Sequence, residues 1–241
     1  MGYHLLSISL EGGRALAASA FQSDTATEPA PQKTEPAPQK MVVLMHGWGA
    51  DSQDLAPLAP MLAADAEMSV IVPDAPDICS ANPFGRQWFE LASSHLASEM
   101  VAQACSGGVT IIHQMLDSLS AAFGVSAENI FLGGFSQGGM IALSAGLVYS
   151  RPLGGIFCLS GGWLTPHQSI TQENSLPIFL AHGAIDPVVP LAMMEASHAA
   201  LLSAGFSAQS LVRPAMPHSI DEAVIEALAG FIAKNSQGRQ I

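Results

Sequence analysis

Short runs of hydrophobic residues recur along the chain from Met41 onward, and polar or glycine-rich segments separate these runs. Continuous apolar runs of this kind are typical of parallel β-strands that are covered on both faces. The predicted strands cover residues 41–46, 68–73, 129–135, 154–159, 177–182 and 208–213. Segments with a helical spacing of apolar residues lie between them. This alternation predicts an α/β fold with a mostly parallel central sheet and helices on both of its faces.

Several segments between the predicted strands carry further signals. "LAPLAPMLAAD", from Leu55, is expected to form one helix, and "ASSHLASEMVAQACSGGVTII" is expected to form a helix broken at Gly107-Gly108. The last helix, "SIDEAVIEALAGFIAK", opens with Ser219 and Glu222 at the spacing of a capping box. The segment from Pro73 to Leu91 is predicted to be a long loop.

The first forty residues follow a different pattern. "YHLLSISL" and "ALAASAF" flank "EGGR", which predicts a β-hairpin over residues 1–23 that turns at Gly12-Gly13. Two copies of "TEPAPQK" follow, and they hold many prolines and no large apolar side chain. Residues 24–40 are therefore predicted to be an extended, solvated linker. Residues 235–241 are expected to be a C-terminal tail.

Composition excludes several classes of partner. The formal net charge is −12 and no basic cluster occurs, which argues against binding to nucleic acid. No apolar stretch reaches the ~20 residues of a membrane span, so no stable membrane anchor is expected. The chain has no Lys or Arg before Arg14, unlike a signal peptide. We therefore predict a cytoplasmic protein.

Metal-ligand and redox motifs are not indicated. The cysteines, Cys79, Cys105 and Cys158, are widely spaced and form no C-x-x-C pair. His46 and His182 each precede a glycine at a predicted strand end, and they are expected to hydrogen-bond the backbone of their turns. The sequence therefore predicts neither a metal nor a cofactor.

The segment "NIFLGGFSQGGM", Asn129 to Met140, places Ser136 between a predicted strand and a predicted helix. A serine inside G-x-S-x-G at such a turn is typical of a nucleophile elbow. Gly134 and Gly138 would allow the sharp turn and close packing of the helix on the strand. A glycine-rich turn without chemistry is the alternative, so the interpretation depends on finding a base and an acid elsewhere.

A serine nucleophile needs a histidine base, and the base needs an acid that orients it. In folds that carry this elbow, the chain order is serine, acid, histidine. His218 lies on a predicted loop between a strand and a helix, whereas His198 lies inside a predicted helix. Asp186 is the only aspartate between Ser136 and His218, and it follows a predicted strand. These positions predict a triad of Ser136, His218 and Asp186.

The negative charge of a tetrahedral intermediate needs N–H donors, which form an oxyanion hole. The N–H of Gln137, directly after Ser136, is one candidate. The second donor is expected from the loop "HGWGAD" after the strand over residues 41–46, where Gly47 and Gly49 allow close approach of the backbone.

Together these segments resemble the phospholipase/carboxylesterase family of α/β-hydrolases, which includes bacterial carboxylesterases and acyl-protein thioesterases. "HGWGAD", "GFSQGG", "HGAIDPVVP" and "MPHSI" resemble four of its motifs in order. The resemblance implies an α/β-hydrolase catalytic domain over residues 41–234. It also implies the triad above, with the N–H groups of Trp48 and Gln137 as oxyanion donors.

Aromatic residues near the predicted strand ends are candidates for substrate binding. "RQWFEL", Arg86 to Leu91, resembles the family's aromatic segment near the acyl pocket. Trp88 and Phe89 are therefore candidates, and packing in the core is an equal alternative. Trp163 and Leu164, after the strand over residues 154–159, are weaker candidates.

The sequence thus predicts a serine hydrolase that cleaves carboxylic esters of short to medium acyl chains through an acyl-enzyme intermediate. The expected substrate is a small-molecule or lipid ester, or an acylated protein. An acyl-protein thioesterase or lysophospholipase is the alternative among enzymes. A non-catalytic binding protein with a hydrolase fold is the alternative from another class. The sequence does not indicate an oligomeric state.

Overall fold

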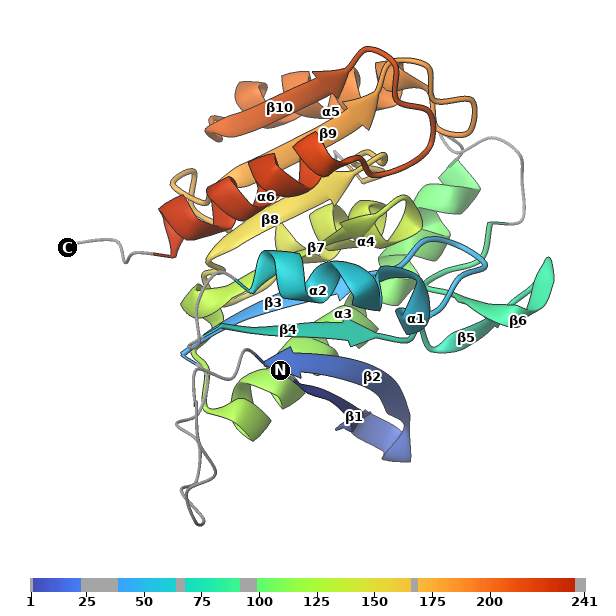
Figure 1. The fold of residues 1–241 in the computed structure, drawn as a ribbon, viewed down its shortest axis with the longest axis vertical. Coiled ribbons are helices and arrows are strands. Elements are labelled where there is room, and N and C mark those ends of the chain that lie inside the picture. The colour runs from blue at the N-terminus through green and yellow to red at the C-terminus, as the bar shows by residue number, and fades with distance from the viewer. Residues whose placement is uncertain (1, 23–38, 64–67, 92–98, 166–168, 237–241) are drawn as a thin grey trace.

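A single eight-stranded sheet runs through the molecule (Figure 1). The structure is a computed structural model that describes residues 2–22, 39–63, 68–91, 99–165 and 169–236. The strand order is β1-β2-β4-β3-β7-β8-β9-β10. The strands are β1 Gly2–Ser9, β2 Ala15–Gln22, β3 Lys40–Met45, β4 Met68–Pro73, β7 Ile130–Phe135, β8 Gly155–Leu159, β9 Ile178–Gly183 and β10 Ala208–Arg213. Within this sheet, β4, β3, β7, β8, β9 and β10 pair in parallel, whereas the pairs β1–β2 and β2–β4 are antiparallel.

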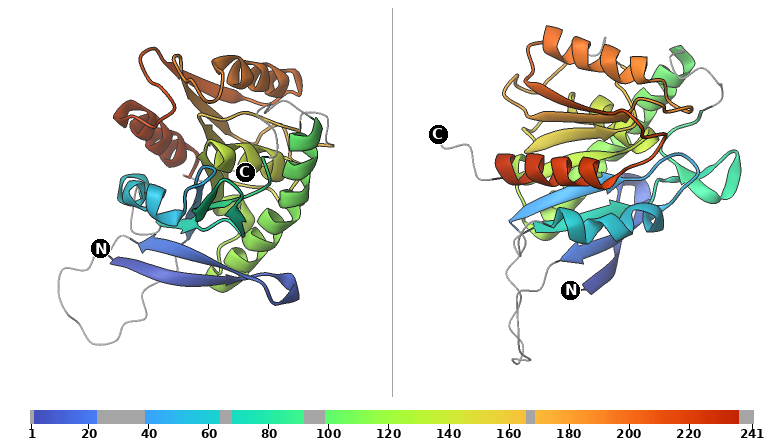
Figure 2. Two further views of the ribbon diagram at one scale, coloured as in Figure 1. Left: turned by 90° about the vertical axis from the view of Figure 1, so that its right-hand side faces the viewer. Right: turned by 45° about the horizontal axis from the view of Figure 1, so that its top comes forward.

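Helices cover both faces of this sheet (Figure 2). The helices are α1 Ser52–Leu55, α2 Ala59–Leu62, α3 Glu99–Phe123, α4 Gln137–Gly146, α5 Leu191–Ser203 and α6 Glu222–Asn235. In Figure 1, α1, α2 and α6 lie in front of the sheet and α3, α4 and α5 lie behind it. The α/β fold with a mostly parallel sheet is therefore confirmed.

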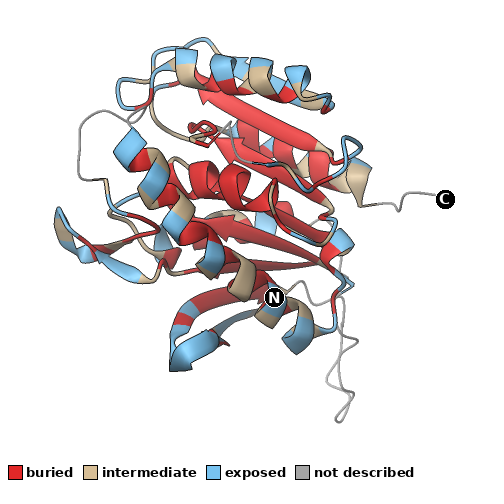
Figure 3. Cartoon of the chain, turned by 180° about the vertical axis from the view of Figure 1, so that it is seen from behind, coloured by how far each residue is buried: buried red, intermediate tan, exposed pale blue. Residues whose placement is uncertain are grey.

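Strand β3 shows why its sequence is continuously apolar from Met41 to Met45. Met41, Val43 and Met45 belong to the hydrophobic cluster under α3, α4 and α5. Val42 and Leu44 belong to the cluster under α1, α2 and α6. Successive side chains of a strand point to opposite faces, so a strand covered on both faces needs a continuous apolar run. The central strands are buried except at Lys40 and Phe135, which are of intermediate exposure (Figure 3).

The expected N-terminal hairpin is present as β1 and β2. A turn at Glu11–Gly13 joins them, and Gly12 and Gly13 have φ values of 72° and 76°, which glycine adopts without strain. Strand β2 pairs with β4, so the hairpin extends the central sheet. The predicted linker lies outside the described residues, except for residues 39–40, where β3 begins. The predicted tail also lies outside them beyond residue 236.

The helical segments differ from the sequence prediction at two places. "LAPLAPMLAAD" does not form one helix, because α1, a 3-10 turn at Ala56–Leu58 and α2 follow one another. Pro57 and Pro60 lack the N–H that a continuous helix needs. Conversely, α3 is not broken at Gly107-Gly108. A side chain at Gly108 would lie 3.0 Å from the carbonyl oxygen of Trp88, so glycine there permits close packing rather than a break.

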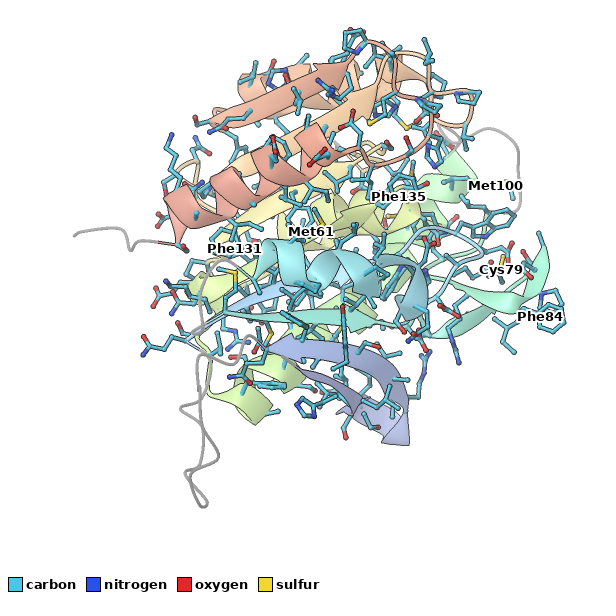
Figure 4. All side chains as sticks on the ribbon, in the orientation of Figure 1. Met61, Cys79, Phe84, Met100, Phe131 and Phe135 are labelled. Atoms are coloured by element: carbon cyan, nitrogen blue, oxygen red, sulfur yellow. The ribbon has the colours of Figure 1, made fainter. Side chains whose placement is uncertain are left out.

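The segment over residues 73–91 is not a plain loop. It contains a two-stranded antiparallel hairpin, β5 Asp77–Cys79 and β6 Asn82–Gln87. In Figure 4, Phe84 projects outward from this hairpin. Its side chain is 92% exposed. Weak hydrophobic alternation and the proline at position 83 conceal these strands in the sequence.

The predicted capping box at Ser219 is also wrong. Helix α6 begins at Glu222, and the N-cap is Asp221, whose carboxylate accepts a hydrogen bond from the N–H of Val224 at 3.0 Å. An aspartate is a strong N-cap, and Ser219 instead belongs to the loop that carries His218.

Strand β10 differs from the predicted strand that is covered on both faces. It lies at the edge of the sheet, and Val212 is 40% exposed.

Candidate active site

Ser136 lies at the turn between β7 and α4, where the sequence predicts it. Its φ of 52° and ψ of −118° belong to a region that residues with a side chain rarely adopt. Two hydrogen bonds hold the turn. The N–H of Ser136 donates to the carbonyl of Leu159 at 2.8 Å, and the carbonyl of Ser136 accepts from the N–H of Met140 at 3.0 Å. The strained serine is thus fixed between β8 and α4.

Two glycines bring this turn close to the end of β3. A Cβ atom at Gly134 or at Gly138 would lie 2.2 Å from the carbonyl oxygen of Met45. No side chain fits at that distance. The G-x-S-x-G spacing therefore has a direct steric cause, since it allows Ser136 to approach the loop that follows β3.

Asp186 and His218 meet at the ends of β9 and β10. Oδ2 of Asp186 lies 2.7 Å from Nδ1 of His218. Oδ1 of Asp186 accepts from the N–H groups of Val188 and Val189 at 2.8 and 2.9 Å. The aspartate side chain is fully buried and that of His218 is 17% exposed. Because an ionised carboxylate can only accept, Nδ1 of His218 carries the proton and Nε2 is left as an acceptor.

His218 packs against the residue that precedes Ser136. The rings of Phe135 and His218 lie 4.7 Å apart at an angle of 44°. Figure 4 places Phe135 in the region where β7 ends and α4 begins. Packing against Phe135 therefore places the imidazole beside the elbow.

Ser160 supports the histidine loop, and sequence reasoning missed this residue. Its hydroxyl donates to the carbonyl of Ser219 at 3.2 Å, directly after His218. It also has a positive φ of 49°, at the end of β8. The position of Ser160 directly after a buried strand, next to a pair of glycines, is the available sequence signal.

His182 lies next to Asp186. Its Nε2 is 2.9 Å from the carbonyl oxygen of Val189 and 3.4 Å from Oδ2 of Asp186. The expected backbone contact of His182 is therefore confirmed. His182 ties the end of β9 to the turn that holds Asp186.

The segment "HGWGAD", which is predicted to supply an oxyanion donor, begins directly after β3. Nδ1 of His46 donates to the carbonyl of Gly47 at 2.7 Å, and its Nε2 accepts from the N–H of Ala75 at 3.0 Å. Burial lowers the pKa of His46, which keeps the ring neutral, as this pair of bonds requires. Within the described part of the chain, the N–H groups of Trp48 and Gln137 have no acceptor.

The candidate substrate-binding residues have different surroundings. Trp88, Phe89 and Trp163 are buried in the cluster under α3, α4 and α5, and Leu164 packs against that cluster. Core packing, the alternative left open for Trp88 and Phe89, accounts for these positions, and substrate contact stays a prediction. The indole of Trp48 is 37% exposed and donates to Oε1 of Gln87 at 3.0 Å.

Other reactive groups in the described residues offer no second site. No three His, Cys, Asp or Glu side chains there come together in a way that could hold a metal ion. Burial raises the pKa of the thiols of Cys105 and Cys158 to about 12, so both stay protonated at neutral pH. None of the described helices combines the length and the apolar character that crossing a membrane requires.

Comparison with known proteins gives a consistent result. A probable carboxylesterase of Oryza sativa subsp. japonica is 31% identical over 226 residues, which is 88% of this chain and 84% of the relative. An acyl-protein thioesterase 1 of Gibberella zeae is 27% identical over 208 residues, 78% of this chain and 84% of the relative.

Solved structures agree in fold. The esterase PE8 superposes with a TM-score of 0.79 and 26% identity, over 91% of this chain and 98% of that structure. SOBER1 of Arabidopsis thaliana gives a TM-score of 0.72 and 25% identity, over 81% and 98%. The sequence profile of the phospholipase/carboxylesterase family matches residues 27–236. The chain therefore has the α/β-hydrolase fold and belongs to the phospholipase/carboxylesterase family.

Proposed function

We propose that this chain is a serine hydrolase that cleaves carboxylic esters through a triad of Ser136, His218 and Asp186. The observation that carries this proposal is the 2.7 Å contact between His218 and Asp186, beside the strained turn at Ser136. A binding protein that performs no chemistry would need neither the fully buried carboxylate nor the strain at the serine.

The first half of the reaction forms an acyl-enzyme. Nε2 of His218 takes the proton of Ser136 Oγ, and that oxygen attacks the acyl carbonyl. Asp186 accepts from Nδ1 and stabilises the resulting imidazolium. The oxyanion accepts hydrogen bonds from the N–H groups of Trp48 and Gln137, both of which lack an acceptor within the described residues. The alcohol then leaves with the proton from His218.

The second half repeats these steps with water. His218 takes a proton from water, the hydroxide attacks the acyl-enzyme, and Ser136 leaves with the proton returned by His218. All groups in this cycle belong to the chain itself, so it needs no cofactor.

Thioesters are a second candidate substrate class, and the acyl-protein thioesterase relatives favour it. The proposed substrates are thus small-molecule or lipid esters with short to medium acyl chains, or acylated proteins. The cytoplasmic location stays part of this proposal. A series of ester and thioester substrates of increasing chain length distinguishes the two classes by their kcat/KM.

The test is ester hydrolysis by Ser136→Ala. We expect kcat to fall by about 10⁶, as when the nucleophile of such a triad is removed. Ser144→Ala is the matched control, since Ser144 is a buried serine on the same helix, α4. This control should keep wild-type activity. Wild-type turnover by Ser136→Ala would overturn the proposal.

A further inference from the structure

The proposed oxyanion donors lie on different elements. Trp48 is in the loop after β3, and Gln137 is the first residue of α4. An oxyanion hole works only when both N–H groups lie about 2.7–3.1 Å from the position that the oxyanion will occupy. Their mutual spacing must therefore be held by some part of the molecule that contacts both.

Segment Asn82–Phe89 consists of β6 and the two residues after it. It forms hydrogen bonds with the backbone of the loop that carries Trp48. The N–H of Gly49 donates to the carbonyl of Arg86 at 2.9 Å, and the N–H of Arg86 donates to the carbonyl of Ala50 at 2.8 Å. Nδ2 of Asn82 also donates to the carbonyl of Gly49 at 2.8 Å.

Strand β6 and the loop after β3 come very close to each other at Gly85. A Cβ atom at Gly85 would lie 1.9 Å from the carbonyl oxygen of Gly49. Glycine is therefore required at this position of β6. The loop that carries the Trp48 N–H is thus held directly against β6.

The same segment contacts the Gln137 side through one buried side chain. Oε1 of Gln137 accepts from the N–H of Trp88 at 2.9 Å, and its Nε2 donates to the carbonyl of Phe89 at 2.8 Å. Gln137 is 1% exposed. Nε1 of Trp88 also donates to the carbonyl of His46 at 2.9 Å, which closes the connection back to the loop after β3.

We propose that segment Asn82–Phe89 sets the spacing of the two oxyanion donors. The positioning residues are Asn82, which belongs to this segment, and Gln137, whose side chain binds to it. This inference rests on the proposed function, because it assigns a role within the same hydrolytic site. Neither side chain touches the substrate. Each acts through the backbone N–H that it holds in place, so its loss weakens binding of the transition state rather than of the substrate.

The test uses Gln137→Met, which keeps the length of the side chain and the backbone N–H but removes both hydrogen bonds. We expect kcat to fall about 10- to 100-fold with KM within about twofold, since a displacement near 1 Å costs up to ~10² in rate. The inhibition constant of a trifluoromethyl ketone, which forms an oxyanion on Ser136, should rise by the same factor as kcat falls. Asn82→Ala should show the same pattern at about 3- to 10-fold.

Phe84→Ala is the control, because Phe84 lies on the same segment with its side chain exposed. This variant should keep wild-type kcat on a short ester. The inference is overturned if both positioning variants keep wild-type kcat, or if kcat falls while the ketone binds as in the wild type. If Gln137→Met does not fold, by circular dichroism, Asn82→Ala alone decides. A wild-type protein that hydrolyses no ester would instead overturn the proposed function.

Discussion

At the scale of single residues, the candidate site depends on how the hydrogen bonds of Asp186 orient the ring of His218. Asp186 uses one carboxylate oxygen for two backbone N–H groups and presents the other to Nδ1 of His218. This arrangement fixes the tautomer of His218, so the lone pair of Nε2 is available to Ser136, the proposed nucleophile. In the proposed triad, the carboxylate therefore orients the base as well as stabilising its charge.

Replacement of Asp186 by asparagine tests this role. In Asp186→Asn, an amide N–H facing His218 would favour the opposite tautomer, so we expect kcat to fall by about 10⁴ with little change in KM. His198→Ala is the control, because His198 lies on α5 with its Nε2 against the carbonyl of Ala208. Steady-state kinetics with one ester measures both. Equal losses in the two variants would contradict the assignment of the histidine.

At the scale of elements, replacing either of two adjacent glycines in α3 by alanine should change the stability of the fold in opposite directions. Nothing lies within 4 Å of a Cβ atom built at Gly107, whereas one at Gly108 would meet Trp88 and Ile141 at 3.0 and 3.2 Å. Gly107→Ala should therefore stabilise the fold by about 0.5–1 kcal/mol, since alanine favours a helix. Gly108→Ala should lose about 1–3 kcal/mol through overpacking. Urea unfolding measures both, and equal changes would contradict the account of α3.

The start of α6 gives a second prediction at this scale. Asp221 accepts from Arg213 Nε at 2.8 Å and caps the helix through Val224, and these contacts lower its pKa. Asp221→Ala should cost about 1 kcal/mol at pH 7, the usual effect of losing an N-cap. Ser219→Ala should cost much less.

The contribution of Asp221 also depends on pH in a definite direction. Because the pKa of its carboxyl is lower in the folded chain, the stabilisation is complete above the ordinary value of 3.8 and is lost as the pH falls below it. The difference in unfolding free energy between wild type and Asp221→Ala should therefore shrink between pH 5 and pH 2. A difference that stays constant over this range would contradict a stabilising contribution from the ionised carboxylate of Asp221.

At the scale of the whole molecule, the sheet and the strand-to-helix turn at Ser136 could be predicted from the sequence because each leaves a local pattern. Strands buried on both faces give continuous apolar runs, such as Met41–Met45. Gly134 and Gly138 are spaced by the steric needs of one turn. The continuity of α3 and the hairpin β5–β6 could not be predicted in this way, because each depends on contacts with distant segments.

The contacts of segment Asn82–Phe89 also depend on residues that are far apart in the sequence, so they could not be predicted from it. Gln137 and Trp88 are 49 positions apart in the chain, and only folding brings them together. A glutamine after a serine nucleophile suggests a backbone donor, but nothing in the local pattern indicates that its side chain holds another segment. Long-range hydrogen bonds between a side chain and the backbone therefore leave no pattern in the local sequence.

Labelling with a fluorophosphonate, followed by mass spectrometry of the labelled protein, shows whether Ser136 is the nucleophile. We expect one adduct per chain on the peptide that contains Ser136, none in Ser136→Ala, and much slower labelling in His218→Ala. Labelling of the wild type should also slow in acid, because a protonated imidazole cannot take the proton of serine. An adduct on another residue, or none on the folded wild-type protein, would contradict this role of Ser136.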